Sequence, residues 1–348
     1  TVTGVQTCAL PIYNLKKIGL SALAGSLVAF SATAGEMTVT GNAGLYMTDG
    51  SKTGKTTFSN SDHVTFSGTT ELDNGYDVTF SLQLDGDEAD DGVIDNHSVT
   101  INTNGMGTIV YAGHGGSSAM SMNDDKTPNA YEEAWDGLGT SAIVINGHGA
   151  NDMITYTSES FGGAVFTVAF VPGEATAATG NKSTYVDYGV TVTPEAVDGL
   201  TLGVAMGTTE ITAGTEVDES TMYATYAYGS FTVGYQTSEY DAPTSTDSDD
   251  STAFGISYAV NDDLSISYNE HTADVGSSTT DQESDGVSVS YTMGGITIAG
   301  HKNEMSAVNG VSGTLNPSTT LFTVGTGVCP VYGCTDTTAL NYDVAADT

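Results

Sequence analysis

The chain lacks arginine entirely: none occurs among its 348 residues. Lysine and arginine together number 7 against 43 aspartates and glutamates, and the formal net charge is −36 at pH 7. A nucleic-acid-binding protein neutralises phosphates with clustered Lys and Arg side chains. The composition therefore excludes a nucleic-acid partner.

Cysteine is scarce as well, and it is confined to the two ends of the chain. Cys8 lies near the start, and Cys329 and Cys334 lie near the end. No disulfide can therefore staple the central region. That region also sustains no helical period, and the hydrophobic content of 39% is low for a conventional packed interior.

The first segment differs in character from the rest of the chain. Residues 1–12 match the peptide obtained by translating a common sequencing adapter, and we interpret them as an artefact. Residues 13–34 are predicted to be a signal peptide: Lys16 and Lys17 precede an apolar run, and Ala32 to Ala34 supply a small-x-small cleavage signal. A transmembrane anchor is the alternative, but the apolar run is short and ends in the cleavage motif.

Residues 329–348 form an appended tail that contains Cys329 and Cys334. The tail resembles a short cysteine-containing repeat of marine bacterial surface proteins, which usually continues to a further cysteine. It is interpreted either as a truncated module or as a fragment joined during sequence assembly. A Cys329–Cys334 disulfide and a pairing with a missing cysteine both stay open.

Residues 35–328 alternate apolar residues with small or polar ones. Such runs include Val186, Tyr188, Val190 and Val192, and then Leu200, Leu202, Val204 and Met206. A period of two residues is that of a β-strand whose two faces differ. The central region is therefore predicted to be all-β.

The connections between these runs sort into two kinds. Tight turns with Gly, Asn, Asp, Ser or Pro fall at 73–75, 104–107, 158–163, 194–199, 229–230, 261–263 and 294–295. Long polar segments fall at 48–61, 85–96, 114–152, 172–183, 208–220, 238–251, 272–284 and 304–319. This alternation predicts a transmembrane antiparallel β-barrel of about sixteen strands, with short periplasmic turns and long extracellular loops.

Aromatic residues gather beside the tight turns. Tyr76, Tyr228, Phe231, Tyr258 and Tyr291 all lie next to one. This placement is typical of an aromatic girdle at the lipid headgroup level. The alternative is the ordinary preference of Tyr and Phe for strands.

Three segments resemble the general Gram-negative porin family, and the likeness extends over nearly all of residues 36–328. The segment from Asn151 to Gly163 is similar to the family's N-x-I-x-Y-x-S-P-x-F-x-G strand and turn, with Ser160 in place of the usual proline. Residues 106–113 are similar to the F-G-x-L-x-x-G strand before the constriction loop, and residues 71–76 to the first periplasmic turn. One departure is that the family normally ends on an aromatic residue, whereas this chain continues past Val328.

The resemblance implies an outer-membrane diffusion pore for small hydrophilic solutes. It also implies contact with outer-membrane lipid, insertion by the barrel-assembly machinery, a homotrimer, and a third loop folded into the lumen. The matching loop is 114–152, whose candidate constriction residues are Asp124, Asp125, Lys126, Glu132, Glu133 and Asp136. In the family such acidic residues face a basic cluster, and this chain has no arginine to build one. We therefore expect a cation-preferring pore; the alternative is that these carboxylates lie on a solvated loop.

The acidic loops suggest metal binding only weakly. Asp85, Asp87, Asp90 and Asp91 lie in one such loop, but their spacing is not that of a calcium-binding loop. No cofactor is expected beyond diffuse Ca²⁺ or Mg²⁺ at the loops.

No enzyme motif is complete. Residues 50–56 are one residue short of a P-loop, and residues 113–116, which are similar to an oxyanion loop, have no G-x-S-x-G partner. We expect no enzymatic activity. Two alternatives are kept: a structural or adhesive surface barrel, and an outer-membrane barrel hydrolase.

Overall fold

The computed structural model describes residues 37–50, 55–85, 94–135, 149–173, 184–212, 215–243, 249–294, 296–316 and 319–328. The segments interpreted as an adapter artefact, a signal peptide and a cysteine-containing tail lie outside these ranges. Among the described residues, no helix is long and apolar enough to cross a membrane.

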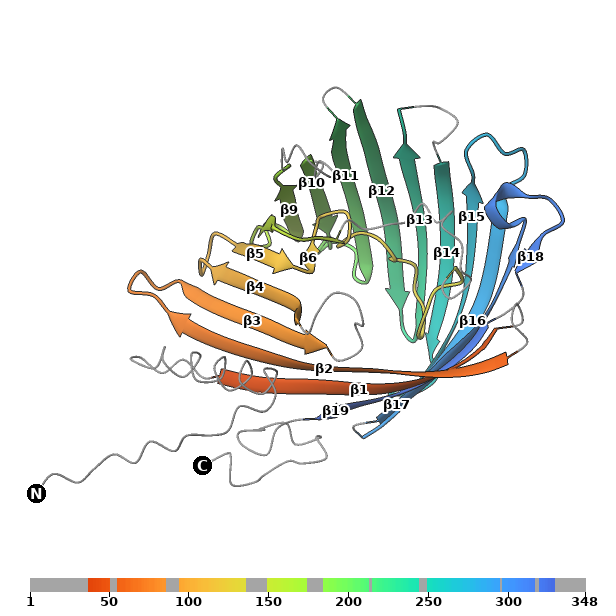
Figure 1. The fold of residues 1–348 in the computed structure, drawn as a ribbon, viewed down its shortest axis with the longest axis horizontal. Helices are drawn as coiled ribbons and strands as arrows, with labels where there is room; N and C mark the ends of the chain where they lie inside the picture. The colour runs from red at the N-terminus through yellow and green to blue at the C-terminus, as the bar shows by residue number, and fades with distance from the viewer. Residues whose placement is uncertain are drawn as a thin grey trace, which may run out of the picture.

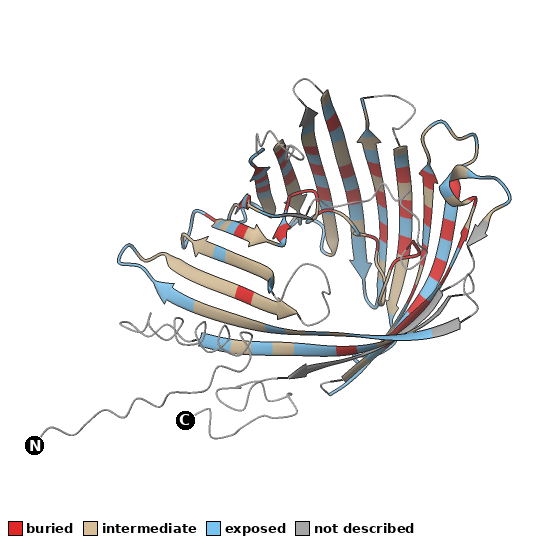
Figure 2. Ribbon diagram, viewed as in Figure 1, coloured by how far each residue is buried: buried red, intermediate tan, exposed pale blue. Residues whose placement is uncertain are grey.

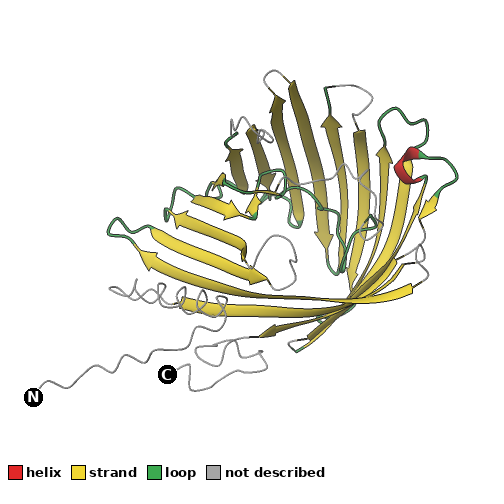
Figure 3. Ribbon diagram, viewed as in Figure 1, coloured by secondary structure: helices red, strands yellow, loops and turns green. Residues whose placement is uncertain are grey.

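The described residues form long antiparallel strands and almost no helix (Figure 3). The first half contains β1 (Met37–Gly50), β2 (Lys55–Glu71), β3 (Asp77–Asp85), β4 (Ile94–Asn102), β5 (Thr108–His114), β6 (Gly116–Ser117), β7 (Gly149–Ala150), β8 (Met153–Thr157) and β9 (Ala164–Val171). The second half contains β10 (Thr184–Val192), β11 (Leu200–Thr212), β12 (Thr215–Tyr228), β13 (Phe231–Asp241), β14 (Asp249–Ala259), β15 (Leu264–Asp274), β16 (Gln282–Met293), β17 (Ile296–Ser306), the 3₁₀ turn η1 (Val308–Gly310), β18 (Leu315–Asn316) and β19 (Thr319–Val328).

Sixteen of the strands within the described ranges form one antiparallel ladder. Apart from β6, β7 and β18, each strand pairs with its neighbours in chain order, and β5 pairs with β8 across the longest connection. The last strand, β19, pairs with both β17 and β1, so the ladder returns to the strand where it began. Figure 1 shows the curved wall that results, with the segment after β5 running along its concave side. The predicted strand number is confirmed.

The faces of this sheet are inverted relative to a soluble protein. On β13, Gln236 and Ser238 are buried, whereas Phe231 and Tyr235 are 50% and 52% exposed. On β16 the buried side chains are again polar or absent, and the exposed ones include Val287 and Val289. Figure 2 shows the buried residues as bands that cross β10 to β17 and continue onto the segment after β5. An apolar outer face and a small polar inner face are those of a strand between lipid and a wet interior.

All seven predicted tight turns join strands in the structure. They connect β2 to β3, β4 to β5, β8 to β9, β10 to β11, β12 to β13, β14 to β15 and β16 to β17. Asn104 adopts a left-handed backbone with φ of 52°, a conformation that Asn tolerates well. Turn chemistry therefore located this rim correctly.

Two of the predicted long loops are wrong in length. Residues 48–50 and 55–61 belong to β1 and β2, and residues 208–212 and 215–220 belong to β11 and β12. Both stretches are rich in Thr, Ser and acidic residues, which suggested loops. Beyond the membrane, however, a strand can be polar on both faces and keep its pairing, as the 2.7 Å bond from the Thr208 hydroxyl to the Asp218 carboxylate illustrates.

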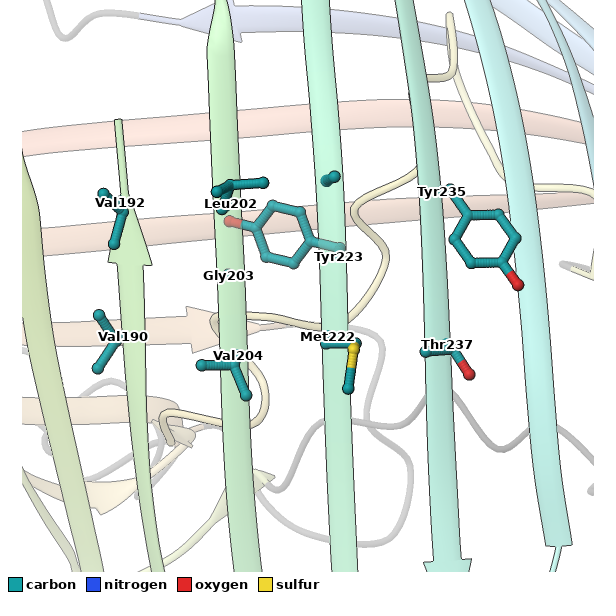
Figure 4. A pocket seen from close by; sticks show the side chains of 10 residues that line it. Val190, Val192, Leu202, Gly203, Val204, Met222, Tyr223, Tyr235 and Thr237 are labelled. Atoms are coloured by element: carbon teal, nitrogen blue, oxygen red, sulfur yellow. The ribbon is translucent and has the colours of Figure 1, made fainter. Parts of the chain in front are cut away.

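The outer wall carries the aromatic residues predicted beside the turns. Tyr228, Phe231 and Tyr291 are 75%, 50% and 40% exposed, and the rings of Phe231 and Tyr258 lie 4.5 Å apart. Farther from the turns, the outward face of β10 to β13 forms a shallow apolar groove (Figure 4). Its lining includes Val190, Leu202, Val204, Met222 and Tyr235.

Carboxylates replace this apolar surface at the other rim. Glu270 on β15 lies opposite Asp285 on β16, which in turn lies opposite Glu304 on β17, and all three are exposed. Glu239, Asp250 and Asp274 form a second such row across β13, β14 and β15. The outer face is thus apolar between an aromatic rim and an acidic rim.

Candidate channel constriction

The candidate constriction is the connection between β5 and β8, described over residues 115–135 and 149–152. Its neck is held by the two-residue ladder of β6 and β7, in which Gly116 lies opposite Ala150. The hydroxyl of Thr155 on β8 also donates to the Ser117 carbonyl at 2.9 Å. We call residues 118–135 the constriction segment.

The constriction segment first meets the wall at β10. The buried carboxylate of Asp187 accepts the Met120 N–H at 2.7 Å, the Ala169 N–H at 3.0 Å and the Tyr185 hydroxyl at 3.0 Å. Two backbone donors and one hydroxyl donor thus satisfy a fully buried negative charge, which would otherwise be strongly unfavourable.

The segment then passes β13, where one amide side chain forms two hydrogen bonds with its backbone. Gln236 accepts the Lys126 N–H at 2.8 Å and donates to the Asn123 carbonyl at 2.8 Å. The Gln236 amide also donates to the Thr221 hydroxyl on β12 at 2.8 Å. Gln236 is fully buried, so its bonds fix the loop backbone to the inner wall.

Similar contacts continue to β17. Asn269 on β15 donates to the Pro128 carbonyl at 3.1 Å, and Asn303 on β17 donates to the Glu133 carbonyl at 2.8 Å. Between them, the Ser288 hydroxyl of β16 accepts the Tyr131 N–H at 3.1 Å. The segment therefore lies along the inner wall from β10 to β17.

Glycines on the wall make room for this path. A Cβ built on Gly255 would lie 2.8 Å from the Pro128 carbonyl oxygen, and one on Gly234 would overlap the Pro128 ring. A Cβ on Gly286 would lie 3.2 Å from the Ala134 Cα. Gly203 lies on β11, and the Tyr223 side chain reaches over it from the directly opposite position on β12 (Figure 4). The missing side chains thus form a track in which the segment lies.

The far end of the segment packs through aromatic rings. Trp135, which is 3% exposed, lies against His271 of β15 with ring centroids 4.8 Å apart. The Tyr131 ring stacks on His301 of β17 at 5.8 Å. Ala134, Trp135 and Ala253 form a small buried apolar cluster here.

The predicted constriction residues fall at two places on this path. Asp124, Asp125 and Lys126 lie where the segment meets β13, and Asp125 is exposed. Glu132 and Glu133 lie near β17; Glu133 is 7% exposed, and its carboxylate accepts a bond from the Asn129 side chain. Asp136 lies outside the described residues. Their role in selectivity stays a prediction.

The weak metal candidates give no defined site among the residues that can be placed. Asp85 ends β3, while Asp87, Asp90 and Asp91 lie outside the described ranges. Within those ranges, no group of three or more His, Cys, Asp or Glu side chains could hold a metal ion.

Sequence reasoning missed the wall residues that hold the segment. These are Asp187, Gln236, Asn269, Ser288 and Asn303, together with Trp135 and His271. The sequence pattern does assign Gln236, Asn269 and Asn303 to inward positions of β13, β15 and β17. An inward polar residue, however, looks the same in sequence whether it lines water or binds a loop.

Comparison with known proteins agrees with this geometry. The model of the family described as Gram-negative porin matches residues 19–304. No curated protein matches the chain.

Among solved structures, an anion-selective porin from Comamonas acidovorans is similar, with 16% identity and a TM-score of 0.61 over 84% of this chain and 99% of that one. OmpT, an outer membrane protein of Vibrio cholerae, shares 14% identity with a TM-score of 0.61 over 85% of this chain and 98% of that one. These likenesses show the fold. Because the family model covers most of the sequence, the chain belongs to the Gram-negative porin family.

Proposed function

We propose that the protein is a passive outer-membrane diffusion channel for small hydrophilic solutes, without enzymatic activity. The observation that carries the proposal is the constriction segment, which lies inside the sheet and is bonded to a polar inner wall from β10 to β17. A polar lumen narrowed by a fixed loop lets small solutes pass by diffusion. Export by the predicted signal peptide, insertion by the barrel-assembly machinery and assembly into a homotrimer belong to the same proposal.

We further propose that the channel prefers cations. The constriction segment carries Asp124, Asp125, Glu132 and Glu133, with Lys126 as its one basic residue in the described part. The described inner wall offers no arginine, because the chain has none. Carboxylates without an opposing basic cluster raise the local cation concentration and repel anions. The Comamonas acidovorans porin is anion-selective, so selectivity must be measured for this chain itself.

Diffuse divalent cations belong to the proposal as well. The two outward rows, Glu270, Asp285, Glu304 and Glu239, Asp250, Asp274, place like charges directly opposite one another across neighbouring strands. Such pairs are destabilising unless they are screened. Ca²⁺ or Mg²⁺ bound loosely to carboxylate oxygens would screen them.

Planar-bilayer recording of the refolded protein tests the channel. We expect stable steps of ohmic current in KCl. Under a KCl gradient, the reversal potential should have the same sign as the K⁺ equilibrium potential, because the channel prefers cations. Anion preference would refute the proposed cation selectivity but not the proposed channel function. Absence of steady conductance would instead favour the adhesive or structural barrel, and hydrolysis of a lipid or peptide substrate would favour the barrel enzyme.

A further inference from the structure

The contact between Trp135 and His271 leaves a histidine buried without a hydrogen bond. His271 is 1% exposed, and neither of its ring nitrogens has a hydrogen-bond partner among the described residues. A neutral imidazole carries one N–H donor and one acceptor. A buried polar side chain is nearly always bonded, so an exception calls for a functional reason.

The described neighbours of His271 form no hydrogen bond with its ring nitrogens. Its neighbours across the ladder are Ala253 on β14 and Ser284 on β16, and its inward neighbours on β15 are Asn269 and Ala273. Within the described ranges the Ser284 hydroxyl has no partner either. Trp135 covers the ring from the side of the lumen.

Charged groups near this contact come only from the constriction segment, as far as the described residues extend. The facing positions on β14, β15 and β16 are uncharged, and a second titratable histidine, His301 on β17, stacks on Tyr131 of the same segment. On the segment, Glu132 and Glu133 precede Trp135, and the Glu133 carboxylate is bonded by Asn129. Asp136 follows in the sequence, outside the described residues.

We propose that the Trp135–His271 contact is an acid-sensitive latch that fastens the far end of the constriction segment to the channel wall. A protonated imidazole beneath Trp135 would be a buried cation with two unbonded donors, which is strongly unfavourable. Proton uptake therefore requires Trp135 to leave, so that water reaches the ring. Acid therefore weakens the contact progressively below about pH 6.5, near which an exposed imidazole is half protonated, and release follows at a lower pH that the stability of the contact sets.

Release would narrow the pore. The wall blocks movement outward, so a freed residue 127–135 stretch can move only toward the lumen. Acid should therefore produce current closures. The latch rests on the proposed channel function for this consequence, but the release of Trp135 itself does not.

The chain contains a single tryptophan, so fluorescence reports the latch directly. In refolded wild-type protein, acidification should shift the Trp135 emission to the red, make it accessible to acrylamide and increase closures in bilayer recordings, all reversibly. His271→Phe keeps a ring under Trp135 but cannot take up a proton, so all three responses should vanish. His63→Asn, which removes a histidine on β2, should respond like wild type.

Three outcomes would overturn the latch: a wild-type Trp135 that stays shielded in acid, an acid response that persists in His271→Phe, or its loss in His63→Asn. If His271→Phe does not fold, His271→Asn serves as the non-titrating variant, and the wild-type titration still decides. A protein with no conductance at any pH would refute the channel, while its fluorescence would still test the latch.

Discussion

Gln236 and Lys126 are 110 positions apart in sequence, yet the Gln236 side-chain oxygen accepts the Lys126 backbone N–H at 2.8 Å. The same side chain donates to the Asn123 carbonyl, so one buried amide closes a two-point clamp on the constriction segment. The clamp lies on β13, near the middle of the segment's path along the wall. Its loss should therefore affect the loop more than the sheet.

Replacing Gln236 by Leu should loosen the constriction segment while leaving the barrel folded. The loop loses two bonds and gains two unsatisfied backbone groups, each costing about 1–3 kcal/mol when buried. Single-channel recordings should show greater open-channel noise and frequent partial closures. The ladder pairs of β13 stay intact, so the barrel should still fold, and its thermal midpoint should fall by no more than the loss of these two bonds accounts for.

Gln236→Glu is the matched variant for this clamp. A carboxylate still accepts from Lys126 but cannot donate to the Asn123 carbonyl, so its noise should fall between that of wild type and Gln236→Leu. Quiet wild-type currents in Gln236→Leu would show that the clamp does not hold the segment.

The glycine track should be sensitive to one added methyl group. In Gly255→Ala the new Cβ meets the Asn269 amide nitrogen and the Pro128 carbonyl, and in Gly234→Ala it meets the Pro128 ring. Overpacking of this kind costs about 1–3 kcal/mol, and we expect the segment rather than the sheet to shift. Conductance should fall in both variants.

Gly68→Ala is the control for the track. Gly68 lies in β2, and a Cβ there meets nothing within 4 Å. Conductance should match wild type, and stability should rise by a few tenths to about 1 kcal/mol. Equal conductance in all three variants would contradict the track.

The sequence predicted the strands and the tight-turn rim well, because alternation and turn residues are local signals. For example, Phe231 and Tyr258, whose rings are in contact, lie next to the predicted turns at 229–230 and 261–263. The strand ends on the other side could not be predicted equally well. Residues 208–210 and 215–220 are mostly Thr, Ser, Asp and Glu, so neither alternation nor a turn marks where pairing stops.

The constriction segment was located by the length of its loop and by family likeness, but the hydrogen bonds that hold it to the wall were not predicted. Asp187, Gln236 and Asn303 act through contacts with residues 67, 113 and 170 positions away. A strand period assigns each of them to the inner face but not to a partner. Such pairings become visible only when the path of the loop is known.

Asp187→Asn should weaken the start of the segment. The carboxylate accepts hydrogen bonds from Met120, Ala169 and Tyr185. An amide turns one acceptor into a donor, so at least one of these buried donors loses its partner, at a cost of about 1–3 kcal/mol. The urea midpoint of the refolded protein should fall.

Asp218→Asn is the comparison for Asp187, since Asp218 is exposed and bonded to the Thr208 hydroxyl. Its effect should stay within about 0.5 kcal/mol. Equal losses in the two variants would show that the burial of Asp187 is not what matters.

Charge selectivity should depend on the carboxylates of the constriction segment. Neutralising them in Asp124→Asn, Asp125→Asn and Glu132→Gln together should move the reversal potential under a KCl gradient toward zero, because fewer negative charges act on ions in the lumen. Glu270→Gln with Asp285→Asn removes charge from the outer face and should leave the reversal potential unchanged. If only the outer variant shifts it, selectivity arises elsewhere.

Calcium should stabilise the acidic rim. Glu270, Asp285 and Glu304 lie in one row of the ladder, where directly opposed like charges are destabilising. Millimolar Ca²⁺ should therefore raise the thermal midpoint of the refolded protein, and a chelator should reverse the rise. The triple variant Glu270→Gln, Asp285→Asn, Glu304→Gln should start from a higher midpoint and gain less from Ca²⁺.

A second triple variant is the control, because it removes the same charge at the opposite rim: Glu159→Gln, Glu195→Gln and Asp198→Asn. These exposed residues do not face one another in the ladder. That triple should keep the full calcium response, because what binds the cation is the opposition of neighbouring carboxylates rather than the net charge. Equal loss of the response in the two triples would mean that net charge alone sets it.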